Sequence, residues 1–243
     1  MFIVIPAYNE GGRIEKTVRD YAGYFGGRAE ILVVLNGCRD RTGEIVKKLA
    51  SEFHNVAYLE FSEAIGKGGA VQEGFRHILV RELGMRNEEL GLIGFVDADE
   101  ATKPEEYDRL SKLMGDASGV IGSRFLKDSV VTGRSLVRSV VGHAFHWIVR
   151  ILFHLPYADT QCGVKIFQQE ALRQILPELR IHGMAFDVEM LVVARRHGLR
   201  IKEAATVWEG KPNSGSLGSS VSIVKSGWKM FWSLVELRGR NYS

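Results

Sequence analysis

Short apolar segments alternate with amphipathic segments along the first half of the chain. The apolar segments, rich in residues that favour β-structure, cover 2–5, 31–35, 56–61, 92–96 and 119–122. Between them, apolar residues recur at helical spacing over 13–25, 41–53, 68–83 and 104–115. Strands that alternate with helices predict a mostly parallel sheet with helices on both faces, a three-layer α/β/α fold.

Composition limits the class of protein. The 243 residues are 45% hydrophobic and 25% charged, which suits one large globular domain. The net charge of +3 is too small to indicate nucleic acid as a partner. Cys38 and Cys162 lie far apart without zinc-binding spacing, as is common in reducing compartments. We find no signal peptide and no apolar run of about 18 residues, so we expect a cytoplasmic protein.

The segment 92–103 carries the most specific chemical signal. An apolar strand ends there in two carboxylates, Asp97 and Asp99. Residues i and i+2 of an extended chain point to the same side, so both carboxylates can face one point. Ligands of open α/β sheets bind at the carboxyl ends of the strands. Two hard oxygen donors there predict a Mg²⁺ or Mn²⁺ site next to a diphosphate, although an Asp-rich turn has the same pattern.

Three further motifs follow earlier strands or precede a helix. Their sequences are Pro6-Ala-Tyr-Asn-Glu10, Asn36-Gly-Cys-Arg-Asp40-Arg-Thr42 and Gly66-Lys-Gly-Gly-Ala-Val71. Tyr8 offers a face on which a base can stack, and Glu10 can accept a hydrogen bond from a base or ribose. The glycine-rich motif is not a P-loop, because Lys67 stands between glycines and no Ser or Thr follows it. Glycines with a lysine at a helix start still fit a phosphate.

In this order the motifs resemble those of the family 2 glycosyltransferases, GT-A-fold enzymes that use nucleotide-sugar donors. The second half resembles the branch that acts on polyprenyl phosphates, the dolichyl-phosphate glucosyltransferases and mannose synthases. The motifs of that branch are Asp97–Lys103, Gly122-Ser-Arg124, Asp159–Phe167 and Phe186-Asp-Val-Glu189. The resemblance covers residues 1–215 and implies one GT-A catalytic domain there, followed by a C-terminal amphipathic helix within 216–243.

The resemblance also implies roles for individual residues. The nucleotide would contact Pro6, Tyr8, Glu10, Asn36, Lys67 and Asp97. The metal would be held by Asp97 and Asp99. The acceptor would be bound by Arg124, Arg134, Arg138, Asp159 and Gln161, and the residues closest to catalysis would be Asp99, Arg124 and Arg138. Asp187 and Glu189 are candidate bases for a hydroxyl acceptor, although a scaffold role suits them better.

Two departures from the family pattern concern the donor. Leu35 and Asn36 stand where the family commonly has two acidic residues, one of which usually recognises the base. Ala101 stands where related mannosyltransferases carry a glutamine ligand of the metal. The second departure is shared with the glucosyltransferase branch. It favours UDP-glucose, with GDP-mannose as the alternative donor.

The chemistry of a polyprenyl phosphate acceptor explains why arginines stand where a catalytic base is expected. A phosphate monoester has a second pKa of about 6 and is largely dianionic at neutral pH, so it needs no base. The enzyme has to position it, hold the leaving diphosphate and exclude water. Direct attack inverts the anomeric centre. We expect a metal-dependent, inverting transferase that moves a hexose, preferably glucose, to this lipid.

Two segments of the second half are unusually apolar. Residues 136–155 and 220–237 each form a helical pattern with a narrow polar stripe, such as Ser139, His143 and His146 in the first. We interpret them as helices at the membrane interface, on the cytoplasmic face of the cell membrane. The alternatives are helices that cover the core, or a homodimer contact.

Other function classes fit less well. A hydroxyl acceptor within the same family would require Asp187 or Glu189 as base. A sugar-phosphate nucleotidyltransferase would carry its glycine-rich loop directly after the first strand, where this chain has Pro6–Glu10. A protein that only binds nucleotide-sugars at a membrane would have little need for both Asp97 and Asp99.

Overall fold

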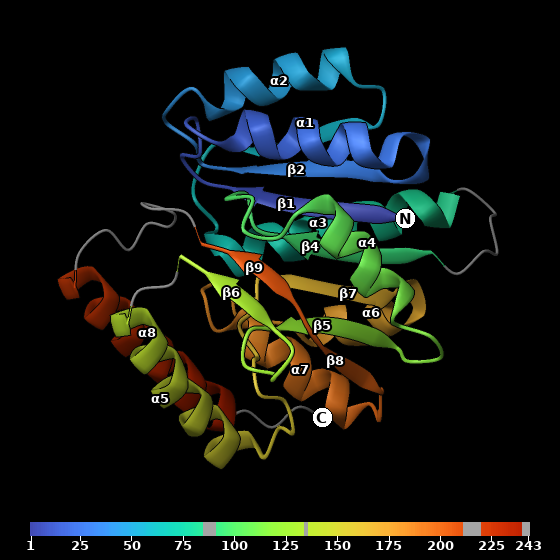
Figure 1. Ribbon diagram of the computed structural model, residues 1–243. Helices are drawn as coiled ribbons and strands as arrows, with labels where there is room; N and C mark the ends of the chain where they lie inside the picture. Colours follow the sequence, from blue (N-terminus) through green and yellow to red (C-terminus); the bar gives the residue numbers. More distant parts are fainter. Residues whose placement is uncertain (85–90, 134–135, 211–219, 240–243) are drawn as a thin grey trace.

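A computed structural model describes residues 1–84, 91–133, 136–210 and 220–239 (Figure 1). Its main sheet has seven strands in the order β3-β2-β1-β4-β7-β5-β8. Their bounds are β1 Phe2–Ala7, β2 Glu30–Asn36, β3 Val56–Phe61, β4 Leu92–Val96, β5 Gly119–Ser123, β7 Val164–Gln168 and β8 Ile201–Ala205. All run in one direction except β7, which is antiparallel to β4 and β5. A second, parallel pair joins β6 Val130–Thr132 to β9 Val207–Glu209.

Helices cover both faces of the main sheet. The first group is α1 Ile14–Phe25, α2 Thr42–Glu52 and α4 Pro104–Lys112; the second is α3 Gly66–Gly84, α6 Gln169–Ile175 and α7 Phe186–Arg196. Successive residues of β1 alternate between two apolar clusters: Ile3 and Ile5 pack with the first group, and Val4 packs with the second. Short 3₁₀ turns lie at Gly26–Arg28 and Leu176–Glu178. The three-layer, mostly parallel α/β fold is therefore confirmed.

The strands and helices expected in the first half are all present, with ends that shift by only a few residues. The second half contains strands that the pattern did not reveal. β7 places Lys165 at the centre of the sheet with no exposed surface, which interrupts the apolar run that marks a buried strand. The expected boundary between 215 and 216 lies outside the described residues, so the domain division stays a prediction.

The two apolar segments form α5 Leu136–Phe153 and α8 Ser220–Gly239, which lie side by side at one end of the molecule (Figure 1). Phe145 and Val149 of α5, and Leu234 of α8, join the core cluster. Trp147 and Trp232 remain more than half exposed. Each helix thus covers the core with one face and leaves apolar side chains on another. Among the described helices, none is both long and apolar enough to cross a membrane.

Candidate active site

A cleft of about 600 Å³ opens at the carboxyl ends of β1, β2 and β4. Its lining includes every residue expected to contact the nucleotide or the metal. These residues are Pro6, Tyr8, Glu10, Asn36, Lys67, Asp97 and Asp99. Parallel strands end at the same edge of the sheet, which is why motifs far apart in the sequence meet there.

Asp97 is fixed by the strand that sequence analysis missed. Its backbone N–H donates to the carbonyl of Gly163, 3.1 Å away and immediately before β7. A Cβ atom on Gly163 would lie only 2.1 Å from Asp97 Oδ2, so the carboxylate needs glycine at that position. Asp97 Oδ1 is buried at the foot of the cleft. It forms an ion pair of 2.5 Å with Lys67 Nζ.

Asp99 lines the same cleft, and its pKa is shifted. Burial and the neighbouring charge of Asp97 raise the pKa of Asp99. Its Oδ1 accepts a hydrogen bond of 3.1 Å from the N–H of Ala101. Across the described ranges, no cluster of three acidic, His or Cys side chains forms a complete metal cage. Two hard oxygen donors with excess negative charge nevertheless fit a divalent cation that takes its other ligands from a diphosphate and water.

A line of alternating charges leads from the cleft into the core. Burial opposes the charge of Lys67, but Asp97 and Asp187 outweigh it and raise the pKa of the ammonium group. Behind it, Lys165 Nζ donates to Asp187 Oδ1 at 2.6 Å and to the carbonyl of Cys162 at 2.9 Å. Burial raises the pKa of Asp187, against the charges of the two lysines. Asp187 therefore serves as a counter-charge for Lys165 and Lys67.

Glu189, the other candidate base, is fully buried and supports a loop. Its Oε2 accepts hydrogen bonds from the backbone N–H groups of Arg180 and Ile181, at 3.0 and 2.7 Å. The same loop packs against the start of α3, where a Cβ on Gly68 would lie 2.6 Å from the carbonyl oxygen of Ile181. The glycines of the Gly66–Val71 motif thus let the loop approach α3 and position Lys67 at the cleft.

The loop that carries Tyr8 and Glu10 is hydrogen-bonded to the Asn36–Thr42 motif. The N–H of Glu10 donates to Thr42 Oγ1 at 2.7 Å, and the N–H of Gly11 donates to Asp40 Oδ2 at 2.9 Å. Burial opposes the charge of Asp40, but its hydrogen bonds outweigh that effect and lower its pKa. Tyr8 keeps 48% of its surface exposed, so its ring is free to stack.

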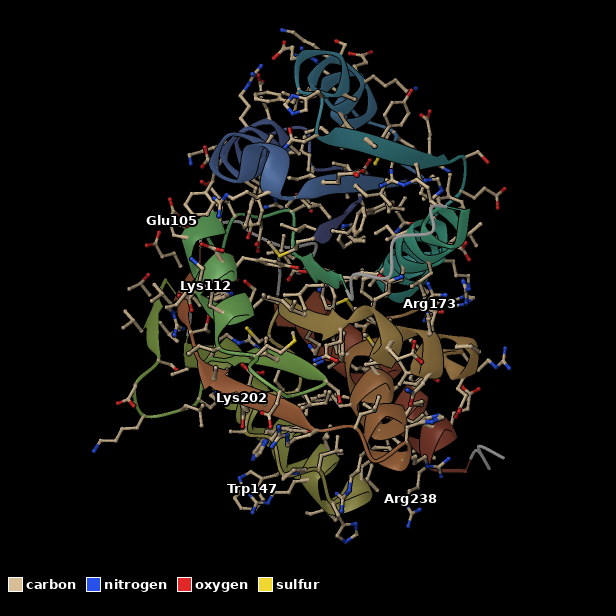
Figure 2. The ribbon with its side chains drawn as sticks, turned by 90° about the vertical axis from the view of Figure 1, so that its right-hand side faces the viewer. Glu105, Lys112, Trp147, Arg173, Lys202 and Arg238 are labelled. Atoms are coloured by element: carbon tan, nitrogen blue, oxygen red, sulfur yellow. The ribbon has the colours of Figure 1, made fainter. Side chains whose placement is uncertain are left out.

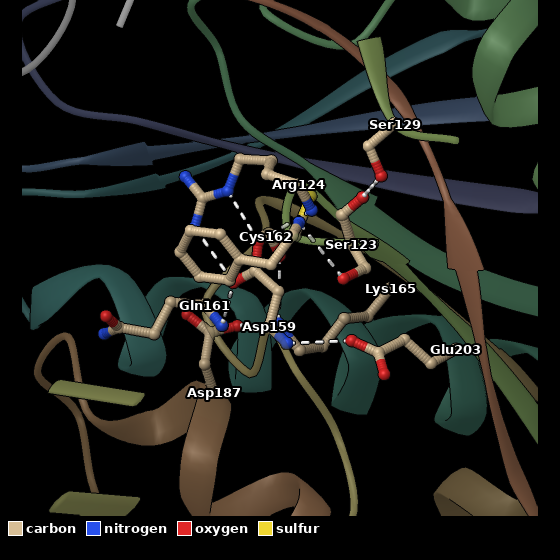
Figure 3. A network of polar contacts seen from close by, with 10 residues as sticks. Ser123, Arg124, Ser129, Asp159, Gln161, Cys162, Lys165, Asp187 and Glu203 are labelled. Carbon is tan, nitrogen blue, oxygen red and sulfur yellow. Dashed lines mark hydrogen bonds and ion pairs between the residues drawn. The ribbon is translucent and has the colours of Figure 1, made fainter. Parts of the chain in front are cut away.

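Arg124 and Asp159 form a second charged centre (Figure 3). Arg124 Nε and Nη2 donate to the two carboxylate oxygens at 2.7 and 3.0 Å, and the Arg124 N–H adds a bond of 3.0 Å. Burial opposes both charges, but their mutual attraction outweighs it, lowering the pKa of Asp159 and raising that of Arg124. The loop that carries Asp159 continues to Gly163, whose carbonyl accepts the N–H of Asp97, so one loop joins this centre to the cleft. The charge of Asp97 also raises the pKa of Arg124.

Of the other residues expected to bind the acceptor, the structure describes the side-chain contacts of Gln161 only. Gln161 donates from its N–H to Asp159 Oδ1 at 3.1 Å, and its side-chain amide lies 3.0 Å from the sulfur of Met230 in α8. Arg134 lies outside the described residues. Arg138 falls in the first turns of α5, where only the helix itself is described. The site therefore unites Arg124, Asp159 and Gln161, while two expected arginines stay predictions.

Sequence reasoning missed several residues that build this site. Glu203 accepts hydrogen bonds from the N–H groups of Ala158 and Asp159, at 2.9 and 2.8 Å, and the guanidinium of Arg124 lies 5.6 Å from the ring centre of Trp208. Both residues come from the last strands, β8 and β9, which carry no recognisable motif. Gly163 is different, since it stands inside the Asp159–Phe167 motif. Glycine is common in turns, so the sequence alone does not show that Asp97 leaves no room for a side chain there.

Comparisons with known proteins agree with this geometry. The family model described as Glycosyl transferase family 2 matches residues 2–176. A dolichyl-phosphate beta-glucosyltransferase of Saccharomyces cerevisiae is 33% identical, with 97% of this chain and 73% of that protein aligned. Glycosyltransferase AglD of Haloferax volcanii is 30% identical over 94% of this chain and 37% of that protein.

Among solved structures, a glucosyl-3-phosphoglycerate synthase from Mycobacterium tuberculosis, in complex with Mn²⁺, UDP and glucosyl-3-phosphoglycerate, superposes with a TM-score of 0.68. That match covers 100% of this chain and 81% of the other at 18% identity, which shows the shared fold. Together with the cleft and its paired aspartates, the match of residues 2–176 shows that the chain is a glycosyltransferase and belongs to glycosyl transferase family 2.

Proposed function

We propose that the protein transfers glucose from UDP-glucose to a polyprenyl phosphate of the dolichyl type, with inversion of the anomeric centre. The observation that carries the proposal is one loop that serves two charged sites: its Asp159 pairs with Arg124, and its Gly163 accepts the N–H of Asp97 at the cleft. A donor diphosphate and an acceptor phosphate need one site each. The relatives named as dolichyl-phosphate beta-glucosyltransferases support glucose and the lipid acceptor.

On the donor side, Asp97 and Asp99 would hold a divalent cation, Mg²⁺ or Mn²⁺, which neutralises the diphosphate as it leaves. Complexes of a structural neighbour with Mn²⁺ and UDP support this choice. Lys67 lies beside Asp97 and is positioned to contact the same diphosphate. Tyr8 and Glu10 line the part of the cleft that would receive the nucleoside.

On the acceptor side, the reaction needs no general base. The phosphate oxygen bonds to the anomeric carbon while the bond from that carbon to the diphosphate breaks, and UDP leaves. Asp187 and Glu189 are buried and held by hydrogen bonds, so their placement favours an acceptor that is already ionised. Arg124 supplies the positive charge that attracts such an acceptor, and Asp159 orients its guanidinium.

The lipid acceptor would bring the protein to the cytoplasmic face of a membrane. The exposed apolar side chains of α5 and α8, among them Trp147 and Trp232, support this peripheral location. Tryptophan favours the boundary between headgroups and acyl chains. Whether two copies associate through the same helices stays a prediction.

A donor screen tests the proposal. The protein is incubated with Mn²⁺ or Mg²⁺, a short-chain polyprenyl phosphate and labelled UDP-glucose, GDP-mannose or UDP-N-acetylglucosamine. We expect a labelled lipid product from UDP-glucose and none from Asp99→Asn. A product from GDP-mannose alone would overturn the choice of sugar. Donor hydrolysis without a lipid product would overturn the acceptor and return Asp187 or Glu189 to the role of base.

A further inference from the structure

A second hollow, of about 290 Å³, opens where α5, α7 and α8 meet. It shares no lining residue with the cleft. Three arginines, Arg195, Arg196 and Arg238, line it together with apolar side chains that include Leu152 and Phe153. Among the residues that the structure describes, no carboxylate belongs to this lining. A hollow that combines cations with an apolar wall fits a ligand that is anionic at one end and apolar at the other.

The three arginines line one hollow because the helices that carry them end next to each other. Arg195 and Arg196 stand in the last turn of α7, and Arg238 stands in the last turn of α8. The guanidinium of Arg195 donates to the carbonyl oxygen of His154, just after α5 ends. All three arginine side chains are exposed to solvent, so an incoming ligand can reach them.

An exposed apolar surface lies on the same two helices. Trp147 and Ile151 are 58% and 68% exposed on α5, and Trp232 and Val235 are 55% and 39% exposed on α8. Spacings of four and three residues put each pair on one side of its helix. Arg238 follows Val235 by a further three residues, so this apolar stripe of α8 leads to the hollow. Figure 2 shows Trp147 and Arg238 at the same end of the molecule.

We infer that this hollow binds the phosphate of an anionic phospholipid headgroup in a bilayer. Charge complementarity carries the inference: Arg195 and Arg238 offer cations in a hollow whose described lining holds no carboxylate, and anionic lipids present a negative surface. The neighbouring tryptophans would sit at the headgroup level, where amphipathic rings are favoured. A free phosphate would use the arginines but would leave the apolar wall and the exposed stripe without a role.

The inference goes beyond the proposed function, because it concerns a lipid that is not consumed. It adds selectivity for anionic membranes to a reaction whose acceptor is also a lipid. Vesicle binding can be measured without turnover, so the two proposals can fail separately.

The test compares sedimentation of the full chain with vesicles of phosphatidylcholine alone and with vesicles that contain phosphatidylglycerol. The test variant is Arg195→Gln/Arg238→Gln. The matched control, Lys48→Gln/Arg173→Gln, removes the same charge from α2 and α6; Figure 2 labels Arg173 and Arg238 at separate places. Each cation near an anionic surface contributes on the order of 1 kcal/mol, so the test variant should bind anionic vesicles roughly 30-fold more weakly.

The control should keep its affinity for anionic vesicles, and both variants should bind neutral vesicles as the unsubstituted protein does. An equal loss in both variants would overturn the inference in favour of general attraction. Displacement from vesicles by millimolar inorganic phosphate would also overturn it, since the site would then accept a free anion. Arg238→Gln alone, at an exposed position, should give a partial loss with unchanged thermal stability and so excludes misfolding.

Discussion

Two aspartate–cation pairs stand on either side of the proposed reaction, and they are built differently. Asp97 and Lys67 meet at the cleft through one charge contact of 2.5 Å, with 34% and 20% of their side chains exposed. Asp159 and Arg124 are joined by three hydrogen bonds of 2.7 to 3.0 Å, with 2% and 15% exposed. The first pair rests on one contact at an open cleft, whereas the second is held by several bonds around a buried carboxylate, so we expect the first to exchange partners more easily.

The difference follows from solvation. A fully buried charge that loses its partner pays a large desolvation penalty, whereas a charge at the edge of an open cleft regains part of its hydration. A ligand that neutralises Asp97 can therefore take the place of Lys67 and release the lysine for another anion. Arg124 is held at one orientation by Asp159, which suits a residue that has to position a phosphate rather than move with it.

The largest effect is expected from the exchangeable side. Asp99→Asn removes one of two oxygen donors of the proposed cation site, and kcat/KM for glucosyl transfer should fall about 1,000-fold. Steady-state kinetics with saturating Mn²⁺ measures the loss. Asp116→Asn changes an exposed aspartate outside the cleft and serves as the control. Turnover within a few-fold of the unsubstituted enzyme would contradict the metal assignment.

On the fixed side, the main loss should be stability. Asp159→Asn leaves the buried Arg124 without its counter-charge, so the free energy of unfolding should fall by about 3 kcal/mol. For a chain of this size, that lowers Tm by roughly 10 °C in thermal unfolding followed by circular dichroism.

The pH dependence of that loss has a defined sign. The folded state lowers the pKa of Asp159, so its carboxylate stabilises the fold above the ordinary aspartate pKa of about 3.9. The stabilisation is lost as the pH falls through the lower, folded-state pKa. The difference in free energy of unfolding between the unsubstituted protein and Asp159→Asn should be largest at pH 7 and should shrink on acidification. A difference that stays constant would mean that packing, not charge, holds the pair.

Lys67→Met should have a smaller effect, which strengthens the binding of one ligand and weakens that of another. Without the lysine, the two aspartates attract a cation more strongly, so Mn²⁺ alone should bind more tightly in calorimetric titration. The donor should bind about tenfold more weakly, because its diphosphate loses a cationic partner. Lys48→Met is the matched control on α2. Weaker binding of both ligands would mean that Lys67 only supports the fold.

The smallest effect separates the two cysteines. Burial raises the pKa of Cys162 to about 12, and the thiol has no exposed surface next to the fixed pair. Cys38 is partly exposed. A thiol reagent at pH 8 should therefore modify one cysteine in the native protein and two after unfolding. Faster modification of Cys162 in Asp159→Asn would show that the fixed pair keeps this region closed, and an unchanged rate would count against that role.

The sequence predicted the nucleotide half of the site better than the acceptor half, for a physical reason. Tyr8 and Asp97 directly follow strands and Lys67 stands at the start of a helix, so the regular alternation of strands and helices predicts that all three meet at one edge of the sheet. Arg124 and Asp159 meet through irregular loops that Glu203 supports from β8. No local pattern encodes such a contact.

Lys165 shows the same limit within the fold. A charged residue at the centre of a strand argues against burial unless a partner is known, and its partner Asp187 lies on α7. The pairing energy that permits burial is therefore non-local. The glycines at the start of α3 were visible in the sequence, but their role, the close approach of the Ile181 loop, depends on a segment more than a hundred residues away.

The insertion of β7 between β4 and β5 also has a consequence for how the protein folds as it is synthesised. Strands β1 to β4 form neighbouring parallel pairs that can assemble early, but Leu92 of β4 pairs with Gln168 of β7. That pairing has to close a long loop, which slows folding in proteins rich in non-local contacts. Until β7 leaves the ribosome, Asp97 lacks the Gly163 carbonyl that positions it. The nascent chain therefore carries both aspartates long before it can organise them into a site.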